Sequence, residues 1–189
     1  LFYVDLWGVV HNGVTLHDKA IKALEEISKK GKEYILLTNA PRPNFAVKLF
    51  LEKLGMTKEI RDHVFTSGEA ALLYLKKNLL NKMFFHVGPP RDFDLFSDFE
   101  KMRSNMIENS EYILCTGLFE NYDEDLMYYK DLFKNNIKKK MICTNPDLIV
   151  DRGNTRELCA GSVAMVFEKM GGEVVYFGKP YPEVYNQSI

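Results

Sequence analysis

The strongest fold signal in this chain lies in the segment Phe2-Tyr3-Val4-Asp5-Leu6-Trp7-Gly8-Val9-Val10-His11-Asn12-Gly13. Residues 1–10 are dense in apolar and β-branched side chains, and they lead into a turn-forming His-Asn-Gly sequence. This pattern predicts a buried strand followed by a loop. One carboxylate, Asp5, interrupts the apolar run. Because a buried carboxylate is costly without a partner or a metal ion, Asp5 is the first candidate for a chemical role.

Helices and short apolar strands alternate after this segment. Apolar residues at helical spacing over 20–27 are followed by a glycine, and a second such pattern runs from about residue 43 to Gly55. Short apolar strands are predicted at 33–38 and at 64–65, and a capping box over 66–69 opens a third helix. Repeated strand-helix units favour a parallel sheet with helices on its faces, and ligands of such sheets gather at the carboxyl ends of the strands.

The pattern changes at Lys82. A strand over 83–87 ends at Gly88-Pro89-Pro90, and residues 91–111 are acidic, aromatic and irregular. Strands are predicted at 112–116 and 140–144, with an amphipathic helix between them.

The change of pattern predicts that a second domain begins at Lys82. After Asn145-Pro146-Asp147 a loop is expected, and then a helix that Gly171-Gly172 closes. Residues 173–177 are predicted to form one more apolar strand.

Composition excludes several functional classes. The 25 Lys and Arg residues nearly balance the 26 Asp and Glu residues, so the net charge of −1 offers no field for nucleic acid or anionic lipid. The apolar runs are far shorter than the roughly 20 residues of a membrane-spanning helix. The three cysteines fit neither a disulfide framework nor a Cys-x-x-Cys site, which favours a cytoplasmic location. The histidines lack zinc-binding spacing. Whether the chain is a monomer or a homodimer is left open.

Polar residues follow three of the predicted strands: Asp5, Thr38 with Asn39, and Lys179. A carboxylate, a hydroxyl group and an ammonium group that converge would supply the nucleophile, the hydrogen-bond donor and the cation that phosphoryl transfer needs. Taken singly, Thr38 is equally consistent with the start of a turn, and Lys179 with a solvated side chain. Asp5 fits a purely structural role less well.

Four short motifs carry a specific resemblance. The segment 2–13 resembles the first motif of the haloacid dehalogenase superfamily, in the version of its class IIA capped phosphatases. Leu36-Leu37-Thr38-Asn39 resembles the second motif, and Phe177-Gly178-Lys179-Pro180 resembles the third. Cys143-Thr144-Asn145-Pro146-Asp147 is similar to the Thr-Asn-Pro-Asp segment of the class IIA cap. The resemblance implies a Rossmann-like parallel-sheet core with an inserted α/β cap at residues 82–172. Residues 1–81 would be the first part of the core, and residues 173–189 would be the segment that returns to it.

The resemblance also implies a mechanism. Asp5 would attack phosphorus and form an aspartyl-phosphate, Thr38 would hold the transferring oxygens, and Lys179 would offset their charge. Mg²⁺ would be bound by the Asp5 carboxylate and the backbone carbonyl of Trp7. The implied activity is hydrolysis of a small phosphoester such as a sugar or aryl phosphate.

The cap would close over this site, and three polar residues are implied as contacts for the substrate: Asn39, Asn145 and Asp147. The resemblance implies a small-molecule phosphoester as the partner, without nucleic acid or membrane. A change at Asn145 or Asp147 is then expected to alter substrate preference more than metal affinity.

Trp7 departs from the family pattern. Most phosphatases of the superfamily carry a second aspartate there, which protonates the leaving group and later activates water. A positioned acid or base contributes roughly 10²- to 10⁴-fold, so its loss predicts slow turnover or a need for good leaving groups. His11 and Asp147 are alternative acids. The other alternative is a protein of impaired activity that binds phosphoesters or regulates through the same pocket.

The acidic Gly-Asp segment that forms the fourth motif of the family, and supplies a further magnesium ligand, does not occur in this sequence. Either the sequence is truncated before that ligand, or the protein lacks the ligand, which would weaken metal binding. The start within an apolar run and the end soon after the third motif favour truncation.

Overall fold

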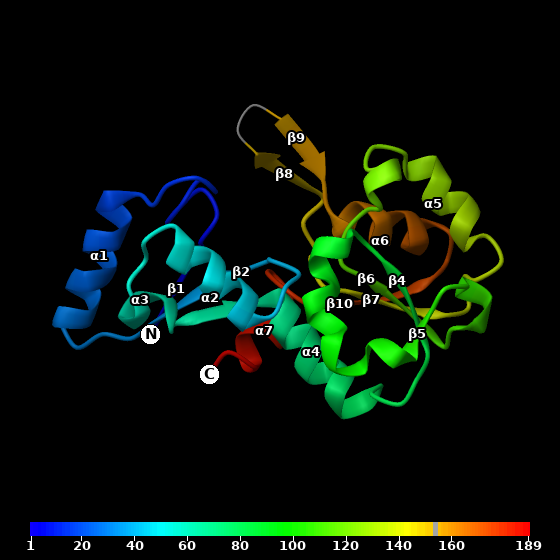
Figure 1. Ribbon diagram of the computed structural model, residues 1–189, viewed down its shortest axis with the longest axis horizontal. Coiled ribbons are helices and arrows are strands. Elements are labelled where there is room, and N and C mark those ends of the chain that lie inside the picture. The colour runs from blue at the N-terminus through cyan, green and yellow to red at the C-terminus, as the bar shows by residue number, and fades with distance from the viewer. Residues whose placement is uncertain (153–154) are drawn as a thin grey trace.

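The computed structural model describes residues 1–152 and 155–189, which form two lobes (Figure 1). The regular helices and strands, in chain order, are β1 (Phe2–Val4), α1 (Asp18–Lys29), β2 (Tyr34–Thr38), α2 (Asn44–Lys53), α3 (Lys58–Arg61), β3 (Val64–Thr66), α4 (Ser67–Asn78), β4 (Phe84–Val87), β5 (Arg103–Ser104), β6 (Tyr112–Cys115), α5 (Leu126–Phe133), β7 (Lys140–Cys143), β8 (Ile149–Arg152), β9 (Thr155–Leu158), α6 (Ala160–Lys169), β10 (Glu173–Tyr176) and α7 (Pro182–Asn186). Short 3₁₀ segments are η1 (Pro90–Met102), η2 (Ile107–Asn109) and η3 (Glu120–Tyr122). No described helix has the length and apolar character needed to cross a membrane.

The first lobe contains a parallel sheet in the order β1-β2-β3, as the alternating pattern predicts. Helices α1, α2 and α4 lie where the sequence indicates, whereas the short helix α3 was not predicted. The backbone of Gly31 adopts a left-handed conformation (φ 65°) just after α1, and the Thr66 hydroxyl accepts a hydrogen bond from the Glu69 amide at 2.8 Å at the start of α4. Leu36 of β2 and Leu51 of α2 are fully buried in the hydrophobic core of this lobe. The predicted α/β fold with a parallel-sheet core is confirmed.

The first predicted strand is less buried than expected. It spans Phe2–Val4 rather than residues 1–10, and the residue Phe2 is 50% exposed. Within the described residues β1 pairs only with β2, so one edge of the strand has no strand partner. An apolar sequence indicates a strand but does not show whether both of its edges are covered.

The second lobe contains a five-stranded parallel sheet in the order β10-β7-β6-β4-β5, with α5 and α6 packed together on one side (Figure 1). The expected return of residues 173–189 to the core is wrong for the strand, because β10 pairs with β7 from Glu173 to Tyr176. The chain leaves the second sheet only after Tyr176. An apolar run predicts a strand but does not say which sheet it joins.

Two parts of the second lobe were expected to be loop or irregular. An antiparallel hairpin, β8–β9, stands where a loop was predicted, and it projects toward the first lobe (Figure 1). The two residues between its strands lie outside the described part. The acidic and aromatic stretch after β4 forms η1, with Phe96 and Phe99 buried.

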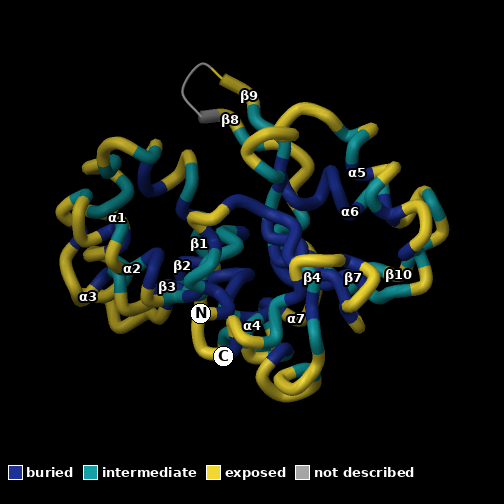
Figure 2. Tube along the Cα trace, turned by 45° about the vertical axis from the view of Figure 1, so that its right-hand side comes forward, coloured by how far each residue is buried: buried dark blue, intermediate teal, exposed yellow. Residues whose placement is uncertain are grey.

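Helix α4 joins the two lobes. Ala70, Ala71 and Leu75 on this helix are fully buried in one hydrophobic cluster that contains Leu37 of the first sheet and Phe84 of the second. Figure 2 shows this continuous buried region between the lobes. The core therefore runs across the expected boundary after residue 81, and the site between the lobes rests on shared packing.

Asp92, near the start of η1, is a buried carboxyl group with a testable effect on stability. It is 3% exposed, and burial raises its pKa from 3.8 to about 6 although the Thr116 hydroxyl and nearby arginines favour the charged form. At pH values between the pKa of Asp92 in the unfolded chain and its pKa in the native state, Asp92 is therefore protonated in the native state and ionised in the unfolded chain. Its contribution to stability is present below the unfolded pKa and is lost as pH rises toward 6, by about 3 kcal/mol at most.

We expect Asp92→Asn to flatten the decline in unfolding free energy between pH 4 and 7, because the amide cannot lose a proton. Urea denaturation at several pH values measures this, with exposed Asp98→Asn in the same segment as the control. Parallel curves for the Asp92 variant and the original protein would show that the Asp92 proton does not govern stability.

Candidate active site

The carboxyl ends of two adjacent strands bring Asp5 and Thr38 to the same edge of the first sheet. Asp5 directly follows β1, and Thr38 is the last residue of β2. Lys179 reaches this edge from the other lobe, three residues after the end of β10. The three predicted catalytic residues thus come from two sheets, a division that the sequence pattern does not reveal.

The Lys179 ammonium group contacts the candidate nucleophile directly. Its Nζ donates to Asp5 Oδ1 at 2.5 Å and to the Leu37 carbonyl oxygen at 3.0 Å. The side chain of Asp5 is 43% exposed and that of Lys179 is 26% exposed. The carboxylate is therefore paired with a cation yet open to an incoming molecule.

Asn39 connects this pair to the inserted domain. Its Oδ1 accepts from the Lys179 backbone amide at 2.7 Å, and its Nδ2 donates to the Lys179 carbonyl at 3.1 Å and to Asp147 Oδ1 at 2.9 Å. Asn39 is 8% exposed, and these bonds engage both ends of its amide. The residue lies in the site, but its geometry favours positioning of Lys179 and Asp147. The predicted substrate contact of Asn39 stays a prediction.

Gly161 and Gly178 pack closely against the turn that contains Asp147. A Cβ atom at Gly161 would lie 2.3 Å from the Pro146 carbonyl oxygen, and one at Gly178 would lie 2.6 Å from Pro146 Cδ. The turn is closed internally by the Asp147 amide, which donates to Asn145 Oδ1 at 2.9 Å. Asn145 therefore shapes the turn and Asp147 faces the site, so the structure separates these two predicted substrate contacts.

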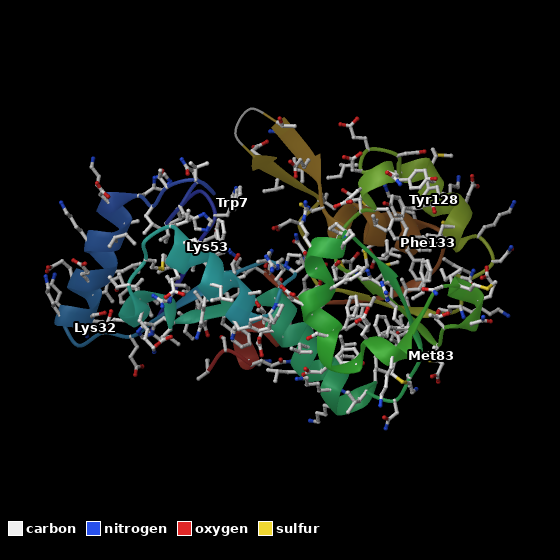
Figure 3. All side chains as sticks on the ribbon, viewed as in Figure 1. Trp7, Lys32, Lys53, Met83, Tyr128 and Phe133 are labelled. Atoms are coloured by element: carbon white, nitrogen blue, oxygen red, sulfur yellow. The ribbon has the colours of Figure 1, made fainter. Side chains whose placement is uncertain are left out.

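Trp7 stands at the position of the expected acid, but its side chain cannot act as one. Its indole Nε1 donates to the Asp151 carbonyl oxygen of β8 at 3.1 Å, and Figure 3 shows Trp7 on the side of the first lobe that faces the hairpin. The Trp7 ring also meets the His11 ring edge-on, with centroids 5.4 Å apart. Sequence reasoning missed Asp151, because the contact uses a backbone carbonyl that leaves no residue signal.

The two alternative acids differ in their electrostatics. Partial burial of its carboxyl group raises the pKa of Asp147, and the Asp5 charge adds to this, while Asn39 and Lys179 oppose it. Burial lowers the pKa of His11, and the nearby His17 lowers it further. His11 Nδ1 also accepts a hydrogen bond from the Gly13 amide at 3.0 Å, which requires an unprotonated nitrogen. The protonated form of Asp147 is therefore favoured relative to that of a free aspartate, whereas the doubly protonated form of His11 is disfavoured.

The donors available to a cation are oxygen atoms. The predicted magnesium ligands are the half-exposed Asp5 carboxylate and the Trp7 carbonyl, two residues apart at the start of a tight turn in which Leu6 O accepts from the Val10 amide. Mg²⁺ prefers such hard ligands and keeps several waters when only one or two protein oxygens bind it. Across residues 1–152 and 155–189, no three His, Cys, Asp or Glu side chains gather as a metal-binding group. The donor set fits a hydrated Mg²⁺ and not a closed metal cage.

Comparison with protein families gives one match over the first half of the chain. The model of the haloacid dehalogenase-like hydrolase family matches residues 2–100. Phosphoglycolate phosphatase 2 of Arabidopsis thaliana is 38% identical over 80 residues, which is 41% of this chain and 26% of that enzyme. The match thus spans about a quarter of the length of the curated relative.

Solved structures resemble nearly the whole chain. A hydrolase of the haloacid dehalogenase-like family from Brucella suis 1330 superposes with a TM-score of 0.88 and 31% identity, over 99% of this chain and 69% of that one. The p-nitrophenyl phosphatase from Archaeoglobus fulgidus superposes with a TM-score of 0.75 and 18% identity, over 99% and 72% of the two chains. The second likeness shows the fold alone.

Proposed function

The chain belongs to the haloacid dehalogenase-like hydrolases, and from this we propose that it is a magnesium-dependent phosphatase of small phosphoesters such as sugar or aryl phosphates. The observation that carries the proposal is the contact between Lys179 Nζ and Asp5 Oδ1 at 2.5 Å, at the carboxyl edge of the first sheet. Relatives whose names give their substrates act on phosphoglycolate and p-nitrophenyl phosphate, both small monoesters.

The proposed reaction begins at the exposed Asp5 carboxylate. One of its oxygens attacks phosphorus in line, the bond to the leaving-group oxygen breaks, and the phosphoryl group stays on Asp5 until water releases it as phosphate. Lys179 offsets the charge of the transferring oxygens, and the Thr38 hydroxyl donates to one of them. Bound Mg²⁺ would supply further neutralisation of that charge from the Asp5 and Trp7 oxygens.

Asp147 is the group that we assign to protonation of the leaving group. Its raised pKa increases the protonated fraction at a given pH, and its bond to Asn39 points it toward the Asp5–Lys179 pair. The protonated fraction falls as pH rises above this pKa, so turnover of alkyl phosphates should decline with rising pH. Aryl phosphates with good leaving groups should decline less.

The variant that tests this role is Asp147→Asn, which can still accept the hydrogen bond from Asn39 but has no acidic proton. We expect kcat for alkyl phosphates to fall by roughly 10²-fold and to lose its pH dependence, with a smaller loss for 4-nitrophenyl phosphate. Steady-state kinetics from pH 4.5 to 8 measure both effects. Equal losses for the two ester classes would show that Asp147 binds substrate and does not protonate it.

A second candidate function is phosphoester binding without turnover. One observation favours it, because the indole of Trp7 bonds the hairpin at the position where the motif that this segment resembles carries an acid. Such a protein would keep the Asp5–Lys179 pocket and release no product.

An assay of phosphate release decides between the two functions. The panel should contain acetyl phosphate, 4-nitrophenyl phosphate, phosphoglycolate and a sugar phosphate, each with Mg²⁺ and with excess EDTA. Release that requires Mg²⁺ supports the phosphatase. Binding of the same esters in calorimetry without release supports the binding protein, and neither binding nor release would refute both.

A further inference from the structure

Trp7 is the one tryptophan in the sequence, and its side chain joins parts of the chain that lie far apart. Its Nε1 donates to the carbonyl of Asp151, 144 residues later, at 3.1 Å. Trp7 belongs to the loop that follows the nucleophile Asp5, and Asp151 belongs to strand β8 of the hairpin. Figure 3 places the Trp7 side chain on the face of the first lobe toward this hairpin.

The Trp7 ring is itself held by its own loop. A Cβ atom at Gly13 would lie 2.8 Å from Cη2 of Trp7, so only a glycine lets the ring lie against the backbone there. The His11 ring packs edge-on against the indole, and the Gly13 amide bonds His11 Nδ1 at 3.0 Å. The indole N–H is therefore presented from a supported position and is not on a freely rotating side chain.

The hairpin starts from the site itself. Its base follows the turn that carries Asp147, and the Cys159 amide closes that base by donating to the Leu148 carbonyl at 2.9 Å. Asp147 bonds Asn39 beneath it. The hairpin is thus anchored at one end beside the substrate site, and Trp7 contacts it partway along β8.

We propose that the Trp7 indole N–H docks the β8–β9 hairpin beside the nucleophile, and that the docked hairpin restricts the leaving group to a small size. This inference rests on the proposed phosphatase function, because Asp5 and Asp147 define where a substrate would lie. Trp7 is then a specificity-determining residue in place of an acid. At the position where the resembling motif carries an acid, this chain has a hydrogen bond to the hairpin.

A single hydrogen bond is enough to alter such docking. Several described residues of the hairpin are exposed, for example Ile149 at 45%, and both side chains of the Arg156–Asp151 ion pair are exposed. A neutral hydrogen bond of this kind changes an equilibrium by roughly threefold to tenfold. Loss of the indole N–H should therefore raise the open fraction of the hairpin by about that factor.

The test compares Trp7→Phe with the original protein. Phenylalanine keeps a ring and the backbone carbonyl but lacks the N–H donor. Arg156→Gln is the control, because it removes an ion pair within the hairpin and leaves the Trp7 contact. Hydrogen exchange of peptides covering β8 and β9, without any ligand, reports docking. The ratio of KM for 1-naphthyl phosphate to KM for phenyl phosphate reports the space available to the leaving group.

We expect Trp7→Phe to speed exchange in the hairpin by roughly threefold to tenfold, with β7 unchanged, and to lower the naphthyl-to-phenyl ratio of KM by a similar factor. Arg156→Gln should leave the ratio of KM unchanged. Unchanged exchange in Trp7→Phe would overturn the docking role, and faster exchange with an unchanged ratio would overturn the specificity role.

Failure of the proposed phosphatase function would be recognised separately, as no phosphate release from any ester. In that case calorimetric dissociation constants for the two esters replace KM in the ratio. An ester that does not bind at all would overturn the specificity role, whereas the exchange experiment still decides the docking role.

Discussion

Asp5→Asn is expected to reduce phosphate release by roughly 10³-fold or more, because removal of a nucleophile eliminates the covalent route. The substitution is nearly isosteric, and the amide oxygen can still accept the hydrogen bond that Lys179 Nζ donates to Asp5 Oδ1. The fold and the position of Lys179 should therefore be preserved. Loss of activity would then report chemistry and not unfolding.

Single-turnover kinetics with 4-nitrophenyl phosphate measure this effect, and mass spectrometry of acid-quenched protein detects the phosphoryl group on the peptide that contains Asp5. Asp131→Asn is the matched control, since it makes the same change at an exposed position of α5. Full activity in the Asp5 variant would rule out Asp5 as the nucleophile. Phosphorylation of a different peptide would assign the nucleophile elsewhere.

The periodic part of the fold could be predicted from the sequence. Alternating apolar strands and amphipathic helices lead to the first sheet, and Thr66 and Glu69 form the predicted cap of α4. Local signals suffice there because each element is set by its own residues and their spacing.

The sheet to which β10 belongs could not be predicted in this way. Its apolar residues pair with β7 of the second sheet, although the motif that follows resembles a core motif. The hairpin was also missed, because β8 and β9 mix charged and apolar residues, as in Thr155–Leu158. Pairing partners depend on long-range packing, which sequence spacing does not encode.

The candidate site was only partly visible in the sequence. The order of the motifs identified Asp5, Thr38 and Lys179 as candidate catalytic residues. In the structure, Asp5 contacts Lys179. The role of Asn39 as a link between Lys179 and Asp147 needs three hydrogen bonds between residues more than 100 positions apart. Contacts that use backbone atoms, such as Trp7 with Asp151, have no signature in residue type.

Lys179→Met is expected to lower kcat/KM by roughly 10²- to 10³-fold, the loss typical of one group that stabilises developing charge in a transition state. Methionine keeps an unbranched apolar stem but removes the cation from Asp5 and the donor from the Leu37 carbonyl. Steady-state kinetics should show the loss mainly in kcat, because the charge on the transferring oxygens matters most in the transition state.

Lys139→Met separates this effect from a loss of stability. The Lys139 ammonium group also bonds backbone carbonyls, those of Glu108 and Ser110, but these lie in the second lobe away from the site. Both variants should lose stability, by about 1–3 kcal/mol for an unpaired carbonyl, and only Lys179→Met should lose catalysis. Equal kinetics in the two variants would show that Lys179 only holds Asp5 and the sheet edge together.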